Sequence, residues 1–385
     1  MNKLNKYIFL ILILISFFLY FIYIIFIPKK YTTFNKETVI IKKRSSNWHD
    51  TAKILKNNPS LKLCVGGHGG WLENDKVLKM NKLKDEGIKN FKILNENEAE
   101  IIVDARTTID ILYIWLSKKD YFIGGSPAPF DISIGGVLSI GGAGFSSISQ
   151  GILAENVIEL YGFKKGTTVI EKQNPYDFMC NLGKNGIITE VKLKCQKYEN
   201  IRWLNFNIHF SKLNEDYYKS ILNNKVKYFN QWIINDISNI TIGTTDSEFK
   251  KSPKILLDKY HKDYKGFKDD SDNKKSVENF TIKPLWACWI FPNCKLYLEF
   301  LDIADNILID LNIDITWHII IVNNSNKLRP THFPLTNAKY SYGIDLFIDT
   351  DKDKWNKIKD NVLPDINKIA LQLQGKPYLI NVKID

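Results

Sequence analysis

The sequence predicts a two-domain protein of mixed strands and helices, preceded by one transmembrane helix. Three observations lead to this prediction. Residues 7–27 form an apolar run without a charge, residues 124–151 are rich in glycine, and beyond Gln196 glycine becomes rare while Trp and Tyr increase. We therefore divide the chain into four parts: a membrane anchor (1–28), a basic linker (29–46), a glycine-rich domain (47–197) and a second domain (198–385).

The apolar run at residues 7–27 is long enough to cross a hydrocarbon core of about 30 Å as a helix. It ends in FIPKKY, without the small residues of a signal-peptide cleavage site, so we expect an uncleaved anchor. More Lys and Arg residues follow the run than precede it, which favours a cytoplasmic body. The sequence thus predicts a single-pass membrane protein whose linker can lie against anionic lipid.

The charge and cysteine content exclude several classes of function. The net charge is 53 − 42 = +11, but Lys and Asn are frequent throughout and no basic cluster with interleaved aromatic residues occurs. We therefore expect no nucleic-acid partner. The five cysteines form no CxxC pair and show no metal-ligand spacing, so we expect buried free thiols and no metal site.

Hydrophobic periodicity and the positions of Gly and Pro predict the order of elements. In the first domain we expect a helix at 48–57, strands at 61–65 and 77–83 (the latter exposed), a hairpin of strands 91–94 and 100–103, a helix at 108–116, and strands at 157–160, 168–170 and 186–193. In the second domain we expect mostly strand over 307–322, a strand at 344–348, and a helix over 354–373 interrupted at Pro364.

The segment 124–151, GGSPAPFDISIGGVLSIGGAGFSSISQG, holds eight of the 21 glycines and many serines. Bare amides and small hydroxyl groups can form a cradle for the phosphate of a cofactor. Alternatively, the glycines mark a tightly packed stretch of chain with close backbone contacts. Composition alone does not decide between the two. Neither this segment nor the glycine turn at 66–70 completes a dinucleotide fingerprint, a P-loop or a hydrolase nucleophile elbow.

Four blocks of sequence carry a resemblance to a known family. They are VGGHGG (65–70), DISIGGVLS (131–139), QGILAENV (150–157), and NPYDF followed by GIITEV (174–178 and 186–191). In this order they resemble the FAD-binding PCMH-type domain of the vanillyl-alcohol-oxidase superfamily. The resemblance implies an α+β fold with a flavin between two subdomains, followed by an α+β substrate cap domain.

The resemblance also implies which residues contact FAD. In some relatives the histidine of the first glycine loop is bonded to the flavin, and that position is His68 here. Because Gly69 replaces the usual serine, covalent and non-covalent attachment both stay open. The implied FAD contacts are Gly66, Gly67, His68, Gly69, Gly70, Ser133, Gly135, Gly136, Ser139, Gly142, Ala143, Gly186, Ile187 and Ile188.

The implied activity is that of an FAD-linked oxidoreductase, which transfers hydride between flavin N5 and an alcohol, sugar-like or lipid-like substrate. His318 in the second domain is a candidate for the group that accepts a substrate proton, although a strand histidine is more often structural. Tyr378 is a candidate substrate contact by comparison with the family. Ala128 replaces the catalytic aspartate of cytokinin dehydrogenases, so their reaction is not expected.

Two further comparisons bear on the substrate. The sequence GKPY at 375–378 keeps the Gly and Pro of the aldonolactone-oxidase motif but lacks its His and Lys. The anchor and the sequence Gly70-Trp71-Leu72 are similar to membrane-bound sterol Δ24-reductases, which favours a small-molecule or lipid-linked substrate. The alternative is a flavin-binding or structural homologue that has lost its catalytic groups.

Overall fold

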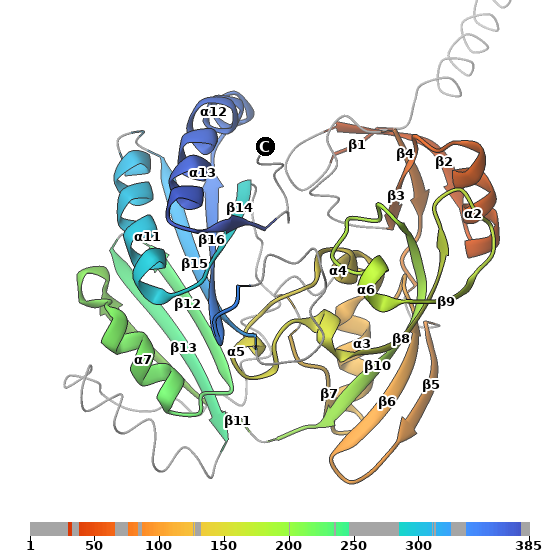
Figure 1. The fold of residues 1–385 in the computed structure, drawn as a ribbon, viewed down its shortest axis with the longest axis horizontal. Helices are drawn as coiled ribbons and strands as arrows, with labels where there is room; N and C mark the ends of the chain where they lie inside the picture. The colour runs from red at the N-terminus through yellow and green to blue at the C-terminus, as the bar shows by residue number, and fades with distance from the viewer. Residues whose placement is uncertain are drawn as a thin grey trace, which may run out of the picture.

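The computed structural model describes residues 30–32, 38–65, 76–83, 87–125, 127, 132–199, 201–234, 236–245, 285–309, 311, 313–324 and 336–378. Within these ranges, no helix has the length and apolar character needed to span a bilayer. The predicted anchor at 7–27, the predicted loop around His68 and the Ala128 position all lie outside them. Three sheets organise the described residues, with two sheets on one side of the molecule and one on the other (Figure 1).

The first sheet has four strands in the order β1-β2-β4-β3. Its elements are β1 (Lys30–Thr32), β2 (Thr38–Ser45), α2 (Trp48–Asn57), β3 (Lys62–Val65) and β4 (Lys76–Met80). Helix α2 has the predicted bounds, and the Asn47 side chain caps it by accepting the Asp50 N–H at 2.8 Å. Strand β2 lies within the segment interpreted as a linker, so the second half of that segment belongs to the folded domain.

The prediction of an exposed strand at 77–83 was wrong. Strand β4 ends at Met80 and pairs in parallel with both β2 and β3, so it lies inside the sheet. Val77, Leu78 and Met80 are fully buried. The lysines that alternate with these residues suggested an edge strand. The neighbouring strands β2 and β3, however, both precede β4 in the chain and cover its two edges.

The second sheet has six strands, and β10 pairs antiparallel with β6, β7 and β8. The predicted hairpin is confirmed, because β5 and β6 pair antiparallel. Four short helices and one 3-10 turn accompany this sheet. The elements are β5 (Ile88–Ile93), β6 (Glu98–Asp104), α3 (Ile109–Ser117), β7 (Tyr121–Phe122), α4 (Ile134–Ile140), α5 (Ser147–Gln150), η1 (Leu153–Asn156), β8 (Val157–Lys164), β9 (Glu171–Gln173), α6 (Pro175–Phe178) and β10 (Gly186–Lys197).

The third sheet has seven strands in the order β11-β13-β12-β15-β16-β14-β17, and every pairing in it is antiparallel. The predicted strand over 307–322 holds only from Asp314, because the residues up to Ile309 end helix α11. Pro364 lies in the first turn of α13, where the predicted interruption occurs. The elements are β11 (Ile201–His209), η2 (Phe210–Lys212), α7 (Glu215–Asn223), β12 (Tyr228–Ile234), β13 (Ile237–Thr245), β14 (Leu285–Phe291), α11 (Cys294–Ile309), β15 (Asp314–Asn323), β16 (Tyr340–Asp349), α12 (Lys352–Lys357), η3 (Ile358–Val362), α13 (Leu363–Gln372) and β17 (Lys376–Pro377).

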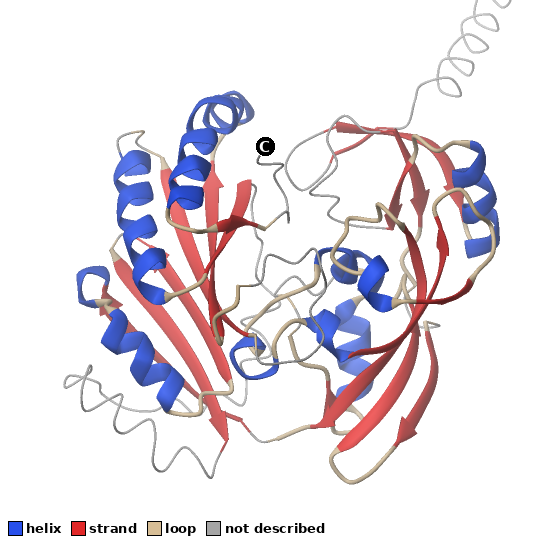
Figure 2. Ribbon diagram, viewed as in Figure 1, coloured by secondary structure: helices blue, strands red, loops and turns tan. Residues whose placement is uncertain are grey.

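The seven-stranded sheet is buried on both faces. Side chains alternate along β15, so Trp317 and Ile319 belong to the core beneath α7, α11 and α13. Ile320 and Val322 belong instead to the core that includes the six-stranded sheet. The helices therefore cover one face of this sheet (Figure 2), and the other face packs against the first half of the chain. His318 lies on the second face, in register with Ile320.

Candidate functional site

The glycine segment 124–151 lies where the two halves of the molecule meet. Helix α5, within this segment, contacts β12 and β15 of the seven-stranded sheet (Figure 1). The Phe145 carbonyl accepts the Phe229 N–H at 2.8 Å, and the Ser149 hydroxyl donates to the Lys227 carbonyl at 2.8 Å. The segment is therefore covered by the face of the sheet that carries His318.

Several glycines of this segment are required by protein packing alone. Gly142 and Gly151 have left-handed backbones, each with φ of +71°. A Cβ on Gly142 would lie 2.4 Å from Val137 Cγ1, and one on Gly151 would lie 1.8 Å from Glu155 Oε2. The close-packing alternative therefore explains these two positions without a ligand.

The first backbone amides of α4, where the resemblance implies FAD contacts, form hydrogen bonds within the protein. The Ile134 N–H donates to the Thr107 carbonyl and the Gly135 N–H to the Ala105 carbonyl, both at 2.8 Å. The Gly136 N–H donates to Ser133 Oγ at 3.3 Å. These three amides are not free for a phosphate. Gly136 itself is exposed, however, and a Cβ there would meet only side-chain atoms, the nearest being Ser133 Oγ at 3.1 Å.

Gly136 and Ala143 are two positions at which the predicted segment is accessible from solvent. Gly136 presents bare backbone to solvent, and Ala143 is half-buried beside the left-handed Gly142. Absence of a side chain at such a position lets a planar ligand approach the main chain. These two positions are accessible at the surface, whereas the first amides of α4 are bonded within the protein, and FAD contact at Gly136 and Ala143 stays a prediction.

His318 forms the centre of a buried polar cluster. It is 5% exposed, and its Nδ1 lies 2.7 Å from Asp345 Oδ2. Its Nε2 lies 2.7 Å from Asn230 Oδ1. Because a carboxylate only accepts hydrogen bonds, Asp345 fixes Nδ1 as a protonated nitrogen. Asn230 Oδ1 is likewise only an acceptor, so in this arrangement Nε2 also donates and the ring offers no free acceptor nitrogen.

Aromatic rings enclose this cluster. The Trp232 ring stacks on the His318 ring with a centroid distance of 4.2 Å and an interplanar angle of 25°. Phe145, from the glycine segment, meets the His318 ring edge-on at 6.1 Å. Phe347 lies at 6.4 Å. The cross-strand register places Trp232 and Asp345 directly opposite His318 on its two neighbouring strands. The cluster therefore connects the sheet with the glycine segment.

Tyr378 links the C-terminal region to the glycine segment. Its N–H donates to the Cys288 carbonyl at 2.8 Å, and its hydroxyl oxygen accepts the Gly142 N–H at 3.2 Å. Burial raises the pKa of the Tyr378 phenol well above its usual value, and the nearby thiols Cys180 and Cys288 raise that pKa further. The phenol is therefore neutral and orients Gly142, and it does not act as a base. The predicted substrate contact of Tyr378 stays a prediction.

The structure places the other predicted residues as follows. Gly186, Ile187 and Ile188 begin β10 beside α4, and a Cβ on Gly186 would lie 2.4 Å from the Phe163 carbonyl oxygen. Ser139 lies on α4 and donates its hydroxyl to the Gly135 carbonyl at 2.7 Å. The loop from Gly66 to Gly70, with His68, lies outside the described residues.

The sequence did not predict the residues that contact His318, namely Asn230, Trp232 and Asp345. Asp345 lies 27 residues from His318 and Asn230 lies 88 residues from it, so only the pairing of strands brings them together. An acidic residue inside an otherwise apolar strand, as at Asp345 within GIDLF, is the one local signal that was available.

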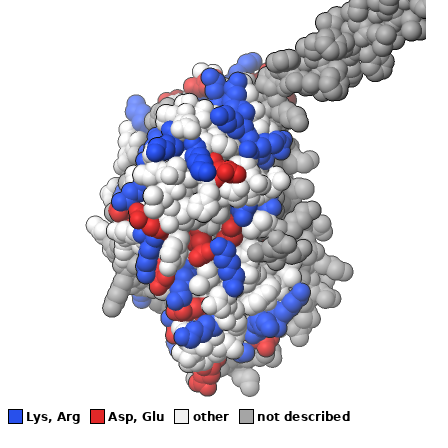
Figure 3. All heavy atoms as spheres, turned by 90° about the vertical axis from the view of Figure 1, so that its right-hand side faces the viewer, with Lys and Arg blue, Asp and Glu red and all other residues white. Residues whose placement is uncertain are grey.

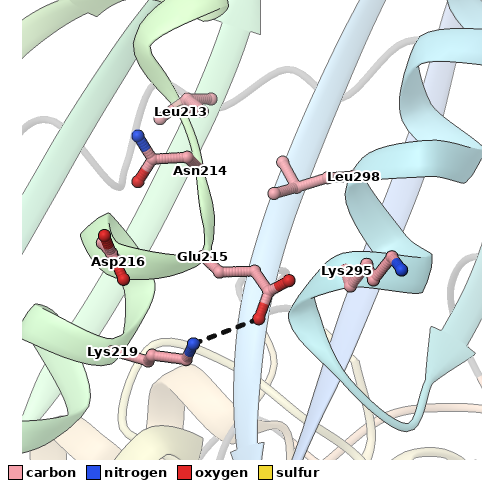
Figure 4. Close-up of a pocket in the computed structure, with 7 residues that line it drawn as sticks. All are labelled: Leu213, Asn214, Glu215, Asp216, Lys219, Lys295 and Leu298. Carbon is pink, nitrogen blue, oxygen red and sulfur yellow. Dashed lines mark ion pairs between the residues drawn. The ribbon is translucent and has the colours of Figure 1, made fainter.

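A separate cavity of about 520 Å³ lies on the helix-covered side of the same sheet (Figure 4). Glu215 and Lys219 of α7 form an ion pair across 3.2 Å within it. It does not adjoin the His318 cluster, which lies on the opposite face of the sheet. Its lining residues are Leu213, Asn214, Glu215, Asp216, Lys219, Lys295 and Leu298.

The architecture belongs to a class of mixed α/β proteins that includes an oxidase of known structure. That structure is a solvent-stable cholesterol oxidase, which superposes with a TM-score of 0.64 at 11% identity, over 91% of this chain and 86% of the oxidase. No protein-family model matches the chain. No curated protein sequence matches it either. At this identity the likeness shows a shared fold, and it confirms the predicted mixed architecture of sheets and helices.

Proposed function

We propose that this chain is an FAD-dependent oxidoreductase that acts on the CH–OH group of a lipid-like or other apolar alcohol. The observation that carries the proposal is the buried His318–Asp345 pair, on the sheet face that covers the glycine segment. The shared fold supports it, because the neighbour's name describes an oxidase of an apolar alcohol. The four blocks of sequence described above support FAD as the cofactor.

FAD supplies the hydride acceptor. Gly136, Ser139 and Ala143 would hold it together with Gly186 to Ile188, and His68 is the residue that could bond it covalently. Tyr378 fixes the Gly142 peptide through its hydroxyl and so determines how the main chain approaches the cofactor.

His318 is the proton acceptor in this proposal. Asp345 holds the proton on Nδ1 and stabilises the ring when Nε2 gains a second proton. The Asn230 amide oxygen accepts from Nε2, so His318 accepts a substrate proton only after Nε2 has lost its own proton and the Asn230 side chain has been displaced. The stacked Trp232 ring holds the imidazole in one orientation and excludes water.

The enclosing residues favour an apolar substrate over a sugar. Trp232, Phe347 and Phe145 surround the imidazole, and Asp345 is already paired with His318. Among the described residues, Asp345 is the one charged group that hydrogen-bonds the His318 ring. A polyhydroxylated substrate would need further polar partners there. An apolar alcohol is also consistent with the proposed anchor at residues 7–27 and a body on the cytoplasmic side.

The test uses the full chain purified in detergent. A flavin absorption spectrum bleached by dithionite establishes the cofactor, and colour that survives acid precipitation establishes a covalent bond. Anaerobic bleaching by sterols, polyprenols and sugar alcohols then identifies the substrate class. We expect His318→Gln to retain flavin and to slow bleaching by about 10²- to 10⁴-fold, because general-base catalysis contributes that much.

His209→Gln is the matched control, since His209 is an exposed histidine on β11 of the same sheet. It should leave both flavin content and rate unchanged. Protein without flavin, or a His318→Gln variant with the full rate, would contradict the proposal. Bound flavin that no alcohol reduces would favour the alternative, a homologue in which the buried and fully bonded His318 is structural.

A further inference from the structure

The four-stranded sheet and α2 carry a strong excess of basic residues. Residues 38–83 contain nine Lys or Arg residues and three acidic residues, Asp50, Glu73 and Asp75. The whole chain has 53 basic and 42 acidic residues, so the general lysine enrichment does not account for this ratio. Six of the nine are exposed: Lys42, Lys43, Arg44, Lys53, Lys56 and Lys76. We call these six residues the basic face.

The basic face differs from the neighbouring six-stranded sheet in its ion pairs. On that sheet, lysines pair with glutamates across strands, as in Lys192–Glu100 at 2.7 Å and Lys172–Glu159 at 3.2 Å. Among the described residues, no member of the basic face takes part in an ion pair. Figure 3 shows the contrast, since Lys and Arg predominate over α2 and β2 while both signs of charge mix over the sheet below.

The basic face is attached firmly to the rest of the protein. Arg106, after β6, donates to both carboxylate oxygens of Asp104 at 3.0 Å, and to the Ser46 carbonyl at 2.7 Å. Trp48, the first residue of α2, donates its Nε1–H to Asp104 at 3.1 Å. These bonds join α2 to the six-stranded sheet, so a surface that binds the basic face also sets the orientation of the whole molecule.

We propose that the basic face docks against the anionic surface of a phospholipid bilayer. Exposed cations without ion-pair partners attract anionic headgroups, and the attraction is strong only within a Debye length of the surface. The apolar run at residues 7–27 ends two residues before β1, the first strand of this same sheet. Any bilayer that holds the run therefore lies close to the basic face, which favours lipid over nucleic acid as the occupant.

The proposal goes beyond the anchor itself, because an anchored body can also rotate freely on its tether. Docking through the basic face fixes one side of the molecule against the headgroups. Each basic residue close to an anionic surface favours contact about fivefold. The six together are therefore expected to slow amide exchange in α2 by at least about tenfold when anionic lipid is present.

The experiment reconstitutes the full chain into nanodiscs of phosphatidylcholine, with or without phosphatidylserine, and follows hydrogen exchange by mass spectrometry. We expect slower exchange in the α2 peptides only in discs with phosphatidylserine, and loss of this protection at about 0.5 M NaCl. Lys53→Glu/Lys56→Glu should abolish the protection. Lys357→Glu/Lys368→Glu, with the same change in charge on helices of the other half, should retain it.

The measurement at high salt uses the unaltered protein, so it tests the proposal independently of any effect of the variants on folding. Equal exchange of α2 in neutral and anionic discs would overturn the proposal. So would protection of α2 by an RNA oligonucleotide when phosphatidylserine gives none. Because the readout requires neither flavin nor substrate, its outcome is separate from that of the proposed activity.

Discussion

Replacing Tyr378 with phenylalanine tests how the C-terminal region holds the glycine segment. The change removes one hydroxyl group and keeps the ring, which is 5% exposed. It leaves the buried Gly142 N–H without its acceptor at 3.2 Å. An unsatisfied buried donor costs about 1–3 kcal/mol. We therefore expect local opening around Gly142 to become easier by that amount, with little change in the apolar packing.

Hydrogen exchange of peptides that contain Gly142 measures this effect directly. A loss of 1–3 kcal/mol corresponds to exchange that is roughly 5- to 150-fold faster. Tyr198→Phe is the control, because Tyr198 is 52% exposed and its hydroxyl group is not required by a buried donor. Unchanged exchange at Gly142 in Tyr378→Phe would refute the argument that this hydroxyl positions the segment.

Two further predictions concern stability. Arg106→Ala removes the cation that neutralises the buried Asp104 carboxylate, so we expect the free energy of unfolding, measured in urea, to fall by about 3 kcal/mol. This is the lower end of the usual range, because Trp48 still donates a hydrogen bond to Asp104. Burial raises the pKa of the Cys195 and Cys294 thiols from near 9 to about 12. The folded state therefore keeps protons that the unfolded chain loses, and stability should be constant below about pH 9 and fall by about 1.4 kcal/mol per pH unit per thiol above it. Unfolding curves between pH 7 and about 10.5 check this, and a flat profile would contradict it.

Local patterns in the sequence predicted the local elements well. Helix α2 begins and ends at the predicted residues, because Asn47 caps it and Asn58-Pro59 terminates it. The prediction failed where a helix and a strand meet in a run rich in isoleucine. Ile307 and Ile309 suggested a strand, whereas Tyr297, Leu301, Ala304 and Leu308 lie buried at helical spacing in α11.

The candidate site could be predicted only in part, for a physical reason. His318 is visible in the sequence as a histidine in an apolar strand, but its chemistry depends on partners supplied by two neighbouring strands. Strand register is a long-range property, and a shift of one residue would turn Asp345 away from the imidazole. No pattern within β15 contains that information.

The glycine segment shows why composition could not decide between a cradle and close packing. A glycine tolerates a ligand and a neighbouring strand for the same reason, the absence of a Cβ. At Gly125 the close atoms are the backbone of Ile152 and Leu153, and at Gly142 and Gly151 they are again protein atoms. These glycines therefore serve close packing within the first half of the chain, and Gly151 also lies near the Asn323 carbonyl of β15. The proposal of a flavin rests instead on the four blocks of sequence, and within the segment on Gly136, an exposed glycine that packing alone does not require.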